Sequence, residues 1–471
     1  MAKRKTPIRQ TKDPIKQSKD SEKQPTGPYP DWKTYMKLDE KYSTLDSDGA
    51  DQLMVYRKPV SDAQFSEWLG KIRDDLRARN EDTDLRIVST CGNCDNSLLL
   101  FIGKGVETFI KTEAARSGNT DPAKSGMQGE DDAAYYSSNL KINLPKRLVK
   151  PAHHKGKPGN YKPSPSTPVK VAVFDTGLVR GEVDSFLTPI VASPCIRTAT
   201  RGWNFTVPNN VWDDDNPSQH GSNVTRFILE EVVRRNNQSV EIIPIKIHNK
   251  DGKSDLYSIL CGFAYAKNMG AKIINASFGY YAPVRDANDK SKDFCLTVFR
   301  KFIKDQLTDH KILLIAAAGN LPSKAEAQAL KKRYPTLDPR GRDLGKVGFY
   351  PASFANDPEL PNVIAVTSVD PKCKFVSLRQ NFSSRVVDIG VQTDNVLCQF
   401  NNPRTGAKIA GSSFATPIVT GLIASNYSLF ENLPTKSNII DKLKNLNTLP
   451  RLEQVKILKN KIKDGVVLIR R

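Results

Sequence analysis

Between residues 169 and 369 the chain alternates short apolar runs, typical of buried strands, with longer segments of helical periodicity. Parallel strands need a crossover of a dozen or more residues, usually a helix, so this order predicts a parallel sheet with helices on both faces. The predicted fold class is α/β, with a doubly wound, mostly parallel sheet. The expected strands are 169–174, 242–247, 272–276, 312–317 and 363–369, and the expected helices are 220–236, 254–269 and 291–309.

Ligands of such sheets bind beyond the carboxyl ends of the strands, where Asp175 and Asn320 stand in this sequence. A carboxylate at Asp175 can hold a histidine in one tautomer and stabilise the imidazolium that forms during proton transfer. The side-chain amide of Asn320 can donate a hydrogen bond to an oxyanion. Taken singly, each residue also has an ordinary interpretation as a cap or turn residue.

Two further residues have the chemistry of nucleophilic catalysis. His220 directly precedes an amphipathic segment, and an imidazole with a pKa near ~6.5 is suited to transfer protons at ordinary pH. Ser413 follows Gly411, which allows a tight turn, and begins an apolar stretch that predicts a helix. A serine at a helix N-terminus can present its hydroxyl to a substrate while its backbone N–H faces the developing oxyanion. On its own, this serine is equally well explained as an N-cap.

Together these segments, in the chain order Asp, His, Asn, Ser, resemble the signature blocks of the subtilisin-like serine peptidases, or subtilases. The resemblance runs from about residue 169 to 430. It implies a subtilisin-like fold and a serine endopeptidase, with Asp175, His220 and Ser413 as the catalytic triad and Asn320 as the side-chain donor of the oxyanion hole. The blocks are Phe174-Asp175-Thr176-Gly177, Ser218-Gln219-His220-Gly221-Ser222, Ala317-Ala318-Gly319-Asn320 and Gly411-Ser412-Ser413-Phe414-Ala415-Thr416-Pro417.

A weaker similarity concerns the substrate. The segment 275–279 resembles the subtilase strand that pairs with the substrate backbone. The resemblance therefore assigns Ser277, Phe278 and Gly279 to substrate binding, and it places Gly319 on the opposite wall of the primary specificity pocket. A protein or peptide is the implied substrate, and no cofactor or metal is expected.

The histidine block departs from the subtilase pattern at two positions. Gln219 stands where subtilases usually have Gly, and Asn223 stands where they usually have a second His. Because the triad is complete, we expect an active enzyme that forms an acyl-enzyme intermediate. The alternative is a catalytically impaired subtilase-fold binding protein that uses basic flanks to contact nucleic acid or an acidic partner.

The formal net charge of +20 is confined to three stretches, 1–26, 141–170 and 432–471. These stretches contain one aromatic residue, Tyr161, so the base stacking that single-strand binders use is not indicated and nucleic acid is not an expected partner. An acidic regulatory partner remains compatible with this distribution. No apolar run approaches the ~20 residues of a membrane-spanning helix, so no membrane association is expected.

Composition divides the chain into four parts. Residues 1–26 are predicted to be a disordered basic tail. Residues 27–118 are predicted to form a small α+β domain, with a helix as late as 106–115, and residues 119–168 a polar, basic, Pro-rich linker. The peptidase domain, with its basic C-terminal segment, is expected over 169–471. The domain at 27–118 is interpreted either as an inhibitory propeptide like those ahead of many subtilase domains or as a permanent accessory module.

The cysteines bear on the cellular setting. There are seven of them, an odd and scattered set that does not predict a disulfide framework, so a reducing environment is expected. Cys91 and Cys94 have metal-ligand or redox spacing, but no second pair completes a zinc site, and a turn between two strands is the preferred interpretation. The start of the chain lacks the apolar stretch of a secretory signal, and the expected location is cytoplasmic.

Overall fold

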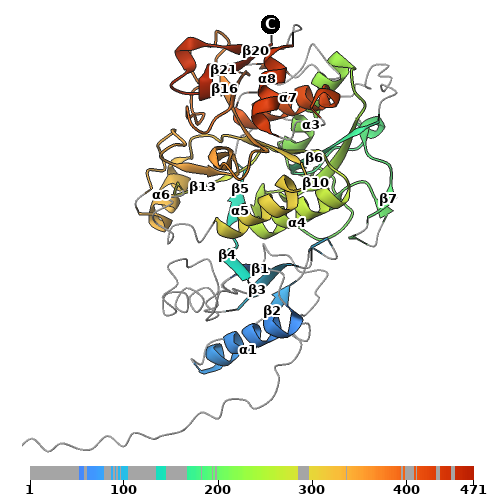
Figure 1. The fold of residues 1–471 in the computed structure, drawn as a ribbon, viewed down its shortest axis with the longest axis vertical. Coiled ribbons are helices and arrows are strands. Elements are labelled where there is room, and N and C mark those ends of the chain that lie inside the picture. The colour runs from blue at the N-terminus through green and yellow to red at the C-terminus, as the bar shows by residue number, and fades with distance from the viewer. Residues whose placement is uncertain are drawn as a thin grey trace, which may run out of the picture.

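The computed structural model describes most of the chain from residue 52 onward (Figure 1). The predicted tail at 1–26, the possible helix at 106–115, Cys295 and Cys398 lie outside the described residues. The described residues are 52–57, 61–78, 86–88, 91, 94–95, 97–103, 134–144, 167–181, 183–193, 195–196, 199–284, 296–335, 337–393, 396–397, 408–409, 411–430, 435–446 and 451–470.

A nine-stranded sheet forms the centre of the C-terminal domain, residues 167–470. Every neighbouring pair in it is parallel except β20 with β21, the antiparallel pair at one edge of the sheet. This arrangement confirms the predicted mostly parallel sheet. In spatial order the strands are β20 (Arg451–Gln454), β21 (Val466–Ile469), β17 (Ile389–Gln392), β16 (Val363–Val369), β14 (Leu313–Ala317), β12 (Ile273–Ala276), β6 (Val169–Asp175), β10 (Val240–Lys246) and β9 (Trp203–Asn204).

Helices cover both faces of this sheet (Figure 1). Because side chains alternate along a strand, Val171 and Val173 of β6 belong to one apolar cluster, and Ala172 and Phe174 to another on the opposite face. The first cluster includes α3 (His220–Arg235), α7 (Ser412–Ala424) and α8 (Lys436–Lys444). The second includes α4 (Leu256–Asn268) and α5 (Thr297–Ile303), which continues as a π-helical segment, Lys304–Thr308.

The described residues of the N-terminal domain, which lie between 52 and 138, form a four-stranded antiparallel sheet and the long helix α1 (Asp62–Ala78). One face of the sheet packs on α1, where Trp68 lies 5.9 Å from Phe101 between ring centroids. The other face packs on the C-terminal domain, where Tyr56 lies 5.2 Å from Phe302. The strand order is β2 (Arg86–Val88), β3 (Leu98–Ile102), β1 (Gln52–Arg57) and β4 (Ala134–Ser138).

The prediction of a linker over 119–168 is wrong for residues 134–144. Strand β4 completes the N-terminal sheet, and β5 (Lys141–Asn143) pairs with β11 (Lys253–Asp255) of the C-terminal domain. The stretch is polar overall, but every second residue is apolar, and these residues, Leu140, Ile142 and Leu144, are all buried. Such alternation is the mark of a strand with one covered face.

The structure also contains disulfide bonds, which the odd and scattered set of cysteines did not predict. Cys91 is bonded to Cys261 and Cys94 to Cys195, across 170 and 101 residues of sequence, and the free Cys373 is buried. The spacing of cysteines along the chain carries no information on which of them meet in space. With these bonds in place the cysteine content no longer supports a reducing setting, and the cytoplasmic location stays a prediction.

Among the described residues, no helix combines the length and the apolar character needed to cross a membrane.

Candidate active site

Asp175 and His220 meet at the carboxyl edge of the sheet. Asp175 ends β6, His220 begins α3, and the imidazole Nδ1 lies 2.7 Å and 2.9 Å from the two carboxylate oxygens of Asp175. Asp175 is almost fully buried and also accepts a hydrogen bond from the Thr176 backbone N–H. The carboxylate therefore fixes one ring nitrogen and leaves the other, Nε2, for proton transfer.

The two departures in the histidine block are accommodated locally. Gln219 has left-handed backbone angles, φ 47° and ψ 45°, a conformation that glycine adopts freely and that costs other residues about 1–2 kcal/mol. Asn223, which is buried, donates to the Ser218 carbonyl and accepts from Arg226, so its amide ties the first turn of α3 to the preceding loop. Neither change separates His220 from Asp175.

A second carboxylate, Asp214, adds to the charge around His220. It accepts hydrogen bonds from the backbone N–H and the hydroxyl of Ser222, at 3.0 and 2.7 Å. Burial raises the pKa of Asp214 above its ordinary value despite these bonds. Burial lowers the pKa of His220, but the charge of Asp175, its hydrogen bond and the charge of Asp214 outweigh burial, and the His220 pKa is raised.

Nothing in the sequence distinguishes Asp214, because a run of three aspartates, at 213–215, is typical of a solvated loop. In the structure each has its own partner. Arg180 lies 2.7 Å from Asp213, and Lys246 lies 2.7 Å from Asp215. Among the described residues there is no group of three or more His, Cys, Asp or Glu side chains arranged to hold a metal ion.

Ser413 lies in the first turn of α7, after Gly411 at φ 125°. Its carbonyl would normally accept a hydrogen bond from the N–H four residues later, but that residue is Pro417, which has none. The hydroxyl of Ser277 donates to the Ser413 carbonyl instead, at 2.8 Å. The next residue, Phe414, lies against His220, with 5.3 Å between ring centroids. Because Pro417 has no N–H, the Ser413 carbonyl is free to bind Ser277, the residue that follows β12 (Ile273–Ala276).

Asn320 and Ser413 line one cavity of about 270 Å³. The residues assigned to substrate binding, Ser277, Phe278, Gly279 and Gly319, line the same cavity. The hydroxyl of Ser412 accepts a hydrogen bond from the Gly319 backbone N–H at 3.0 Å, which holds the serine and asparagine segments together. The structure therefore gathers the asparagine, the serine and the four substrate-binding candidates around one opening. The Asp175–His220 pair is linked to this group through Phe414, which follows Ser413 and lies against His220.

The strand β5 of the connecting segment lies along the same cavity. It runs antiparallel to β11, with Ile142 opposite Ser254, and the Leu144 backbone N–H donates to the Gly252 carbonyl at 2.8 Å. Lys141 to Leu144 line the cavity together with Ser413 and Asn320. The ladder between β5 and β11 is the arrangement that an extended peptide adopts when it adds a strand to a sheet edge.

The fold and the site identify the class of protein when they are compared with known proteins. The sequence profile described as "Subtilase family" matches residues 166–453, more than half of the chain. The chain belongs to the subtilase family.

Individual relatives are distant. The chain is 32% identical over 167 residues to the cell wall-associated protease of Bacillus subtilis, covering 34% of this chain and 18% of that protein. It is 26% identical over 303 residues to the thermostable alkaline protease of Halalkalibacterium halodurans, covering 61% and 63%. The chain thus spans less than two thirds of either protein.

A solved structure of the epidermin leader peptide processing serine protease from Staphylococcus aureus, in an alanine-mutant form, matches with a TM-score of 0.55 at 18% identity. The match covers 89% of this chain and 97% of that one. The unmutated form matches with a TM-score of 0.52 at 17% identity. At these identities the likeness establishes the fold.

Proposed function

We propose that the protein is an endopeptidase that cleaves peptide bonds through an Asp175-His220-Ser413 triad. The observation that carries the proposal is the Asp175–His220 pair at 2.7 Å, whose imidazole lies against Phe414, the residue that follows Ser413. Ser413 and Asn320 line one cavity together. A protein or peptide substrate follows from the class of enzyme. An impaired peptidase is not favoured, because Gln219 and Asn223 leave the pair intact.

In the proposed mechanism, His220 Nε2 accepts the proton of the Ser413 hydroxyl as its oxygen attacks the peptide carbonyl. The Ser413 backbone N–H and the Asn320 side-chain amide stabilise the oxyanion. The imidazolium, stabilised by Asp175, then donates its proton to the leaving amine. Water hydrolyses the resulting Ser413 acyl-enzyme by the same steps in reverse order.

We further propose that β5 holds the enzyme in check by occupying part of the substrate cleft. The support is the ladder with β11 and the presence of Ile142 and Leu144 on the covered side of the strand. An arriving peptide would have to displace these hydrogen bonds and apolar contacts before it could reach Ser413. This assigns an inhibitory role to the segment that follows the N-terminal domain.

Labelling with a fluorophosphonate probe tests both statements. We expect the full chain to be labelled at Ser413, and Ser413→Ala and His220→Ala to remain unlabelled. The variant Ile142→Asp, which places a charge on the covered side of β5, should label faster than the unaltered chain. The matched control is Ile142→Val, which keeps the covered side of β5 apolar and should label at the unaltered rate.

Two outcomes would contradict the proposal. A folded Ile142→Asp protein that is neither labelled nor able to hydrolyse a peptide mixture would refute the triad. Equal labelling rates for Ile142→Asp, Ile142→Val and the unaltered chain would refute the inhibitory role of β5 and leave the triad standing.

A further inference from the structure

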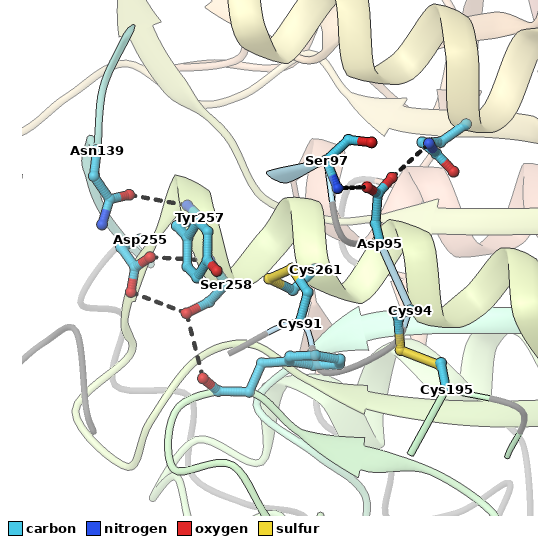
Figure 2. The surroundings of a disulfide bond; sticks show 12 residues. Cys91, Cys94, Asp95, Ser97, Asn139, Cys195, Asp255, Tyr257, Ser258 and Cys261 are labelled. Atoms are coloured by element: carbon cyan, nitrogen blue, oxygen red, sulfur yellow. Dashed lines mark hydrogen bonds between the residues drawn. A yellow bond between two sulfur atoms is a disulfide. The ribbon is translucent and has the colours of Figure 1, made fainter. Parts of the chain in front are cut away.

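The two disulfides join the N-terminal domain to the C-terminal domain. Cys91 and Cys94 lie between β2 and β3 of the N-terminal sheet. Their partners are Cys261, inside α4, and Cys195, between β7 (Val191–Ala192) and β8 (Ala199–Thr200) (Figure 2). Both bonds therefore bridge the connection at 145–166. A chain cut anywhere in that connection would remain one covalent molecule.

We infer that Cys91 and Cys94 form a redox-controlled clamp. It keeps the N-terminal domain and β5 on the active site after the connection is cut, and a dithiol reductant releases them through an internal exchange that ends in a Cys91–Cys94 disulfide. The inference rests on the proposed function for its effect on activity, but the covalent tether itself does not depend on catalysis.

Hydrogen bonds near the disulfides also join the two domains and orient them relative to each other. Tyr56 donates to Asp305 at 3.0 Å, and Gln306 donates to Asp95 at 2.7 Å. Asn268 of α4 donates to the backbone carbonyl of Cys94 at 3.1 Å. These contacts orient the domain, but without the disulfides a cut N-terminal domain is free to dissociate, and inhibition then depends on protein concentration.

All four cysteines are buried, and the Cys94–Cys195 bond is slightly more exposed than the Cys91–Cys261 bond. Cys91 and Cys261 are 1% and 0% exposed, whereas Cys94 and Cys195 are 6% and 3% exposed. Thiol–disulfide exchange requires a thiolate to reach a sulfur atom, so the bond between Cys94 and Cys195 is the entry point for a dithiol. The deeper bond to Cys261 is protected from direct attack as long as the domains are docked.

The spacing of Cys91 and Cys94 provides a path to the deeper bond. The Cys94 backbone N–H donates to the Cys91 carbonyl at 3.1 Å, so the two residues are the ends of one tight turn. Once Cys94 is reduced, its thiolate attacks the Cys91 sulfur, forms Cys91–Cys94 and expels the Cys261 thiolate. Overall, one dithiol loses two electrons and two protons and becomes a disulfide, and Cys195 and Cys261 each gain a thiol hydrogen.

The tether can be tested without catalysis. A Ser413→Ala chain with a recognition site for an external protease inserted at 151–165 is cut and measured by intact mass in denaturant. We expect a single species of the combined mass without reductant and two fragments with excess dithiothreitol. Cys94→Ser should stay joined through Cys91–Cys261, and Cys91→Ser/Cys94→Ser should separate without reductant. Separation of the cut Ser413→Ala chain in the absence of reductant would overturn the tether.

The exchange is tested by stoichiometry. The cut Ser413→Ala protein is treated under native conditions with one equivalent of dithiothreitol and then quenched with acid and alkylated with N-ethylmaleimide. We expect separated fragments, alkylation at Cys195 and Cys261, and a Cys91–Cys94 disulfide in the N-terminal fragment. Fragments still joined through Cys91–Cys261 after one equivalent would overturn the exchange.

The effect on the active site is measured with Ser413 intact. After the external cut, we expect peptide hydrolysis to rise at least ten-fold on addition of dithiothreitol, and the cut Cys91→Ser/Cys94→Ser variant to be active on dilution without it. A tethered protein that is equally active before and after reduction would overturn the clamp. No hydrolysis in either protein, with the fragments separated and the C-terminal domain folded, would refute the proposed function instead.

Discussion

Replacing Phe349 by alanine is expected to change which residue the enzyme accepts on the amino side of the cleaved bond, the P1 position. Phe349 lies in β15 (Gly348–Tyr350) and lines the cavity with Ser413. A Cβ atom added to Gly279 or Gly319 would lie 2.4 Å or 2.6 Å from the Phe349 ring. The ring therefore fills the space between the two proposed walls of the specificity pocket, and the unaltered enzyme should prefer a small P1 residue such as alanine.

The size of the effect follows from the area that the ring occupies. Removing the ring opens a slot in which the side chain of a P1 phenylalanine can take its place between the glycine walls. Full burial of a phenylalanine side chain contributes about 1.5–3 kcal/mol, which corresponds to a gain of about 10- to 150-fold in kcat/KM for that substrate. The same substitution should lower the free energy of unfolding by up to ~3–5 kcal/mol, because Phe349 is largely buried.

The assay compares kcat/KM for two peptides that differ only in alanine or phenylalanine at P1, with thermal unfolding as the check that each variant is folded. Phe354→Ala is the matched control, because Phe354 is as buried as Phe349 and packs on Tyr350, outside the cavity lining. This control should lower stability without changing the substrate ratio. An unchanged ratio in folded Phe349→Ala would refute the reasoning.

Three further predictions concern charge, the oxyanion and the core. Asp214→Asn removes a charge that raises the His220 pKa, so the acidic limb of the profile of kcat/KM against pH should move to lower pH, and a shift to higher pH or none would contradict it. Asn320→Ala should lower kcat by about 10²–10³-fold with little change in KM, which steady-state kinetics will check. Lys436→Met leaves Asp388 buried without the cation that lies 3.0 Å away, so denaturant unfolding should show a loss of ~3–5 kcal/mol, and a loss under 1 kcal/mol would argue against a structural role for the pair.

The local spacing of apolar residues was enough to predict most of the helices and strands of the C-terminal domain. The expected helices at 220–236 and 254–269 correspond to α3 and α4, because amphipathic spacing and chain order are properties of neighbouring residues. The same holds for Asp175 and His220, which stand at the ends of elements that the pattern located, so that their meeting at one edge of the sheet follows from the parallel arrangement.

The features that the sequence did not predict all depend on distant residues. Ile142 lies in a polar stretch and is buried because β5 pairs with β11 and its apolar side joins a cluster of residues distant in the sequence. Cys91 and Cys261 are 170 residues apart in the sequence and meet only where the N-terminal domain contacts α4. Phe349 acts on the cavity through contacts with two glycines that no spacing rule connects to it. Each feature is a consequence of packing between elements rather than of the elements themselves.

The position of β21 has a practical consequence for anyone producing the enzyme. The match to the family ends at residue 453, but β21 inserts between β17 and β20, and Arg470 pairs with Glu230 and Glu231 of α3. A gene trimmed at the family boundary would leave the backbone N–H and C=O groups of β17 without partners along one side, and such a bare edge recruits strands from other molecules. If protein from such a shortened gene is insoluble, the cause would be the missing strand, and the result would say nothing about whether the enzyme is active.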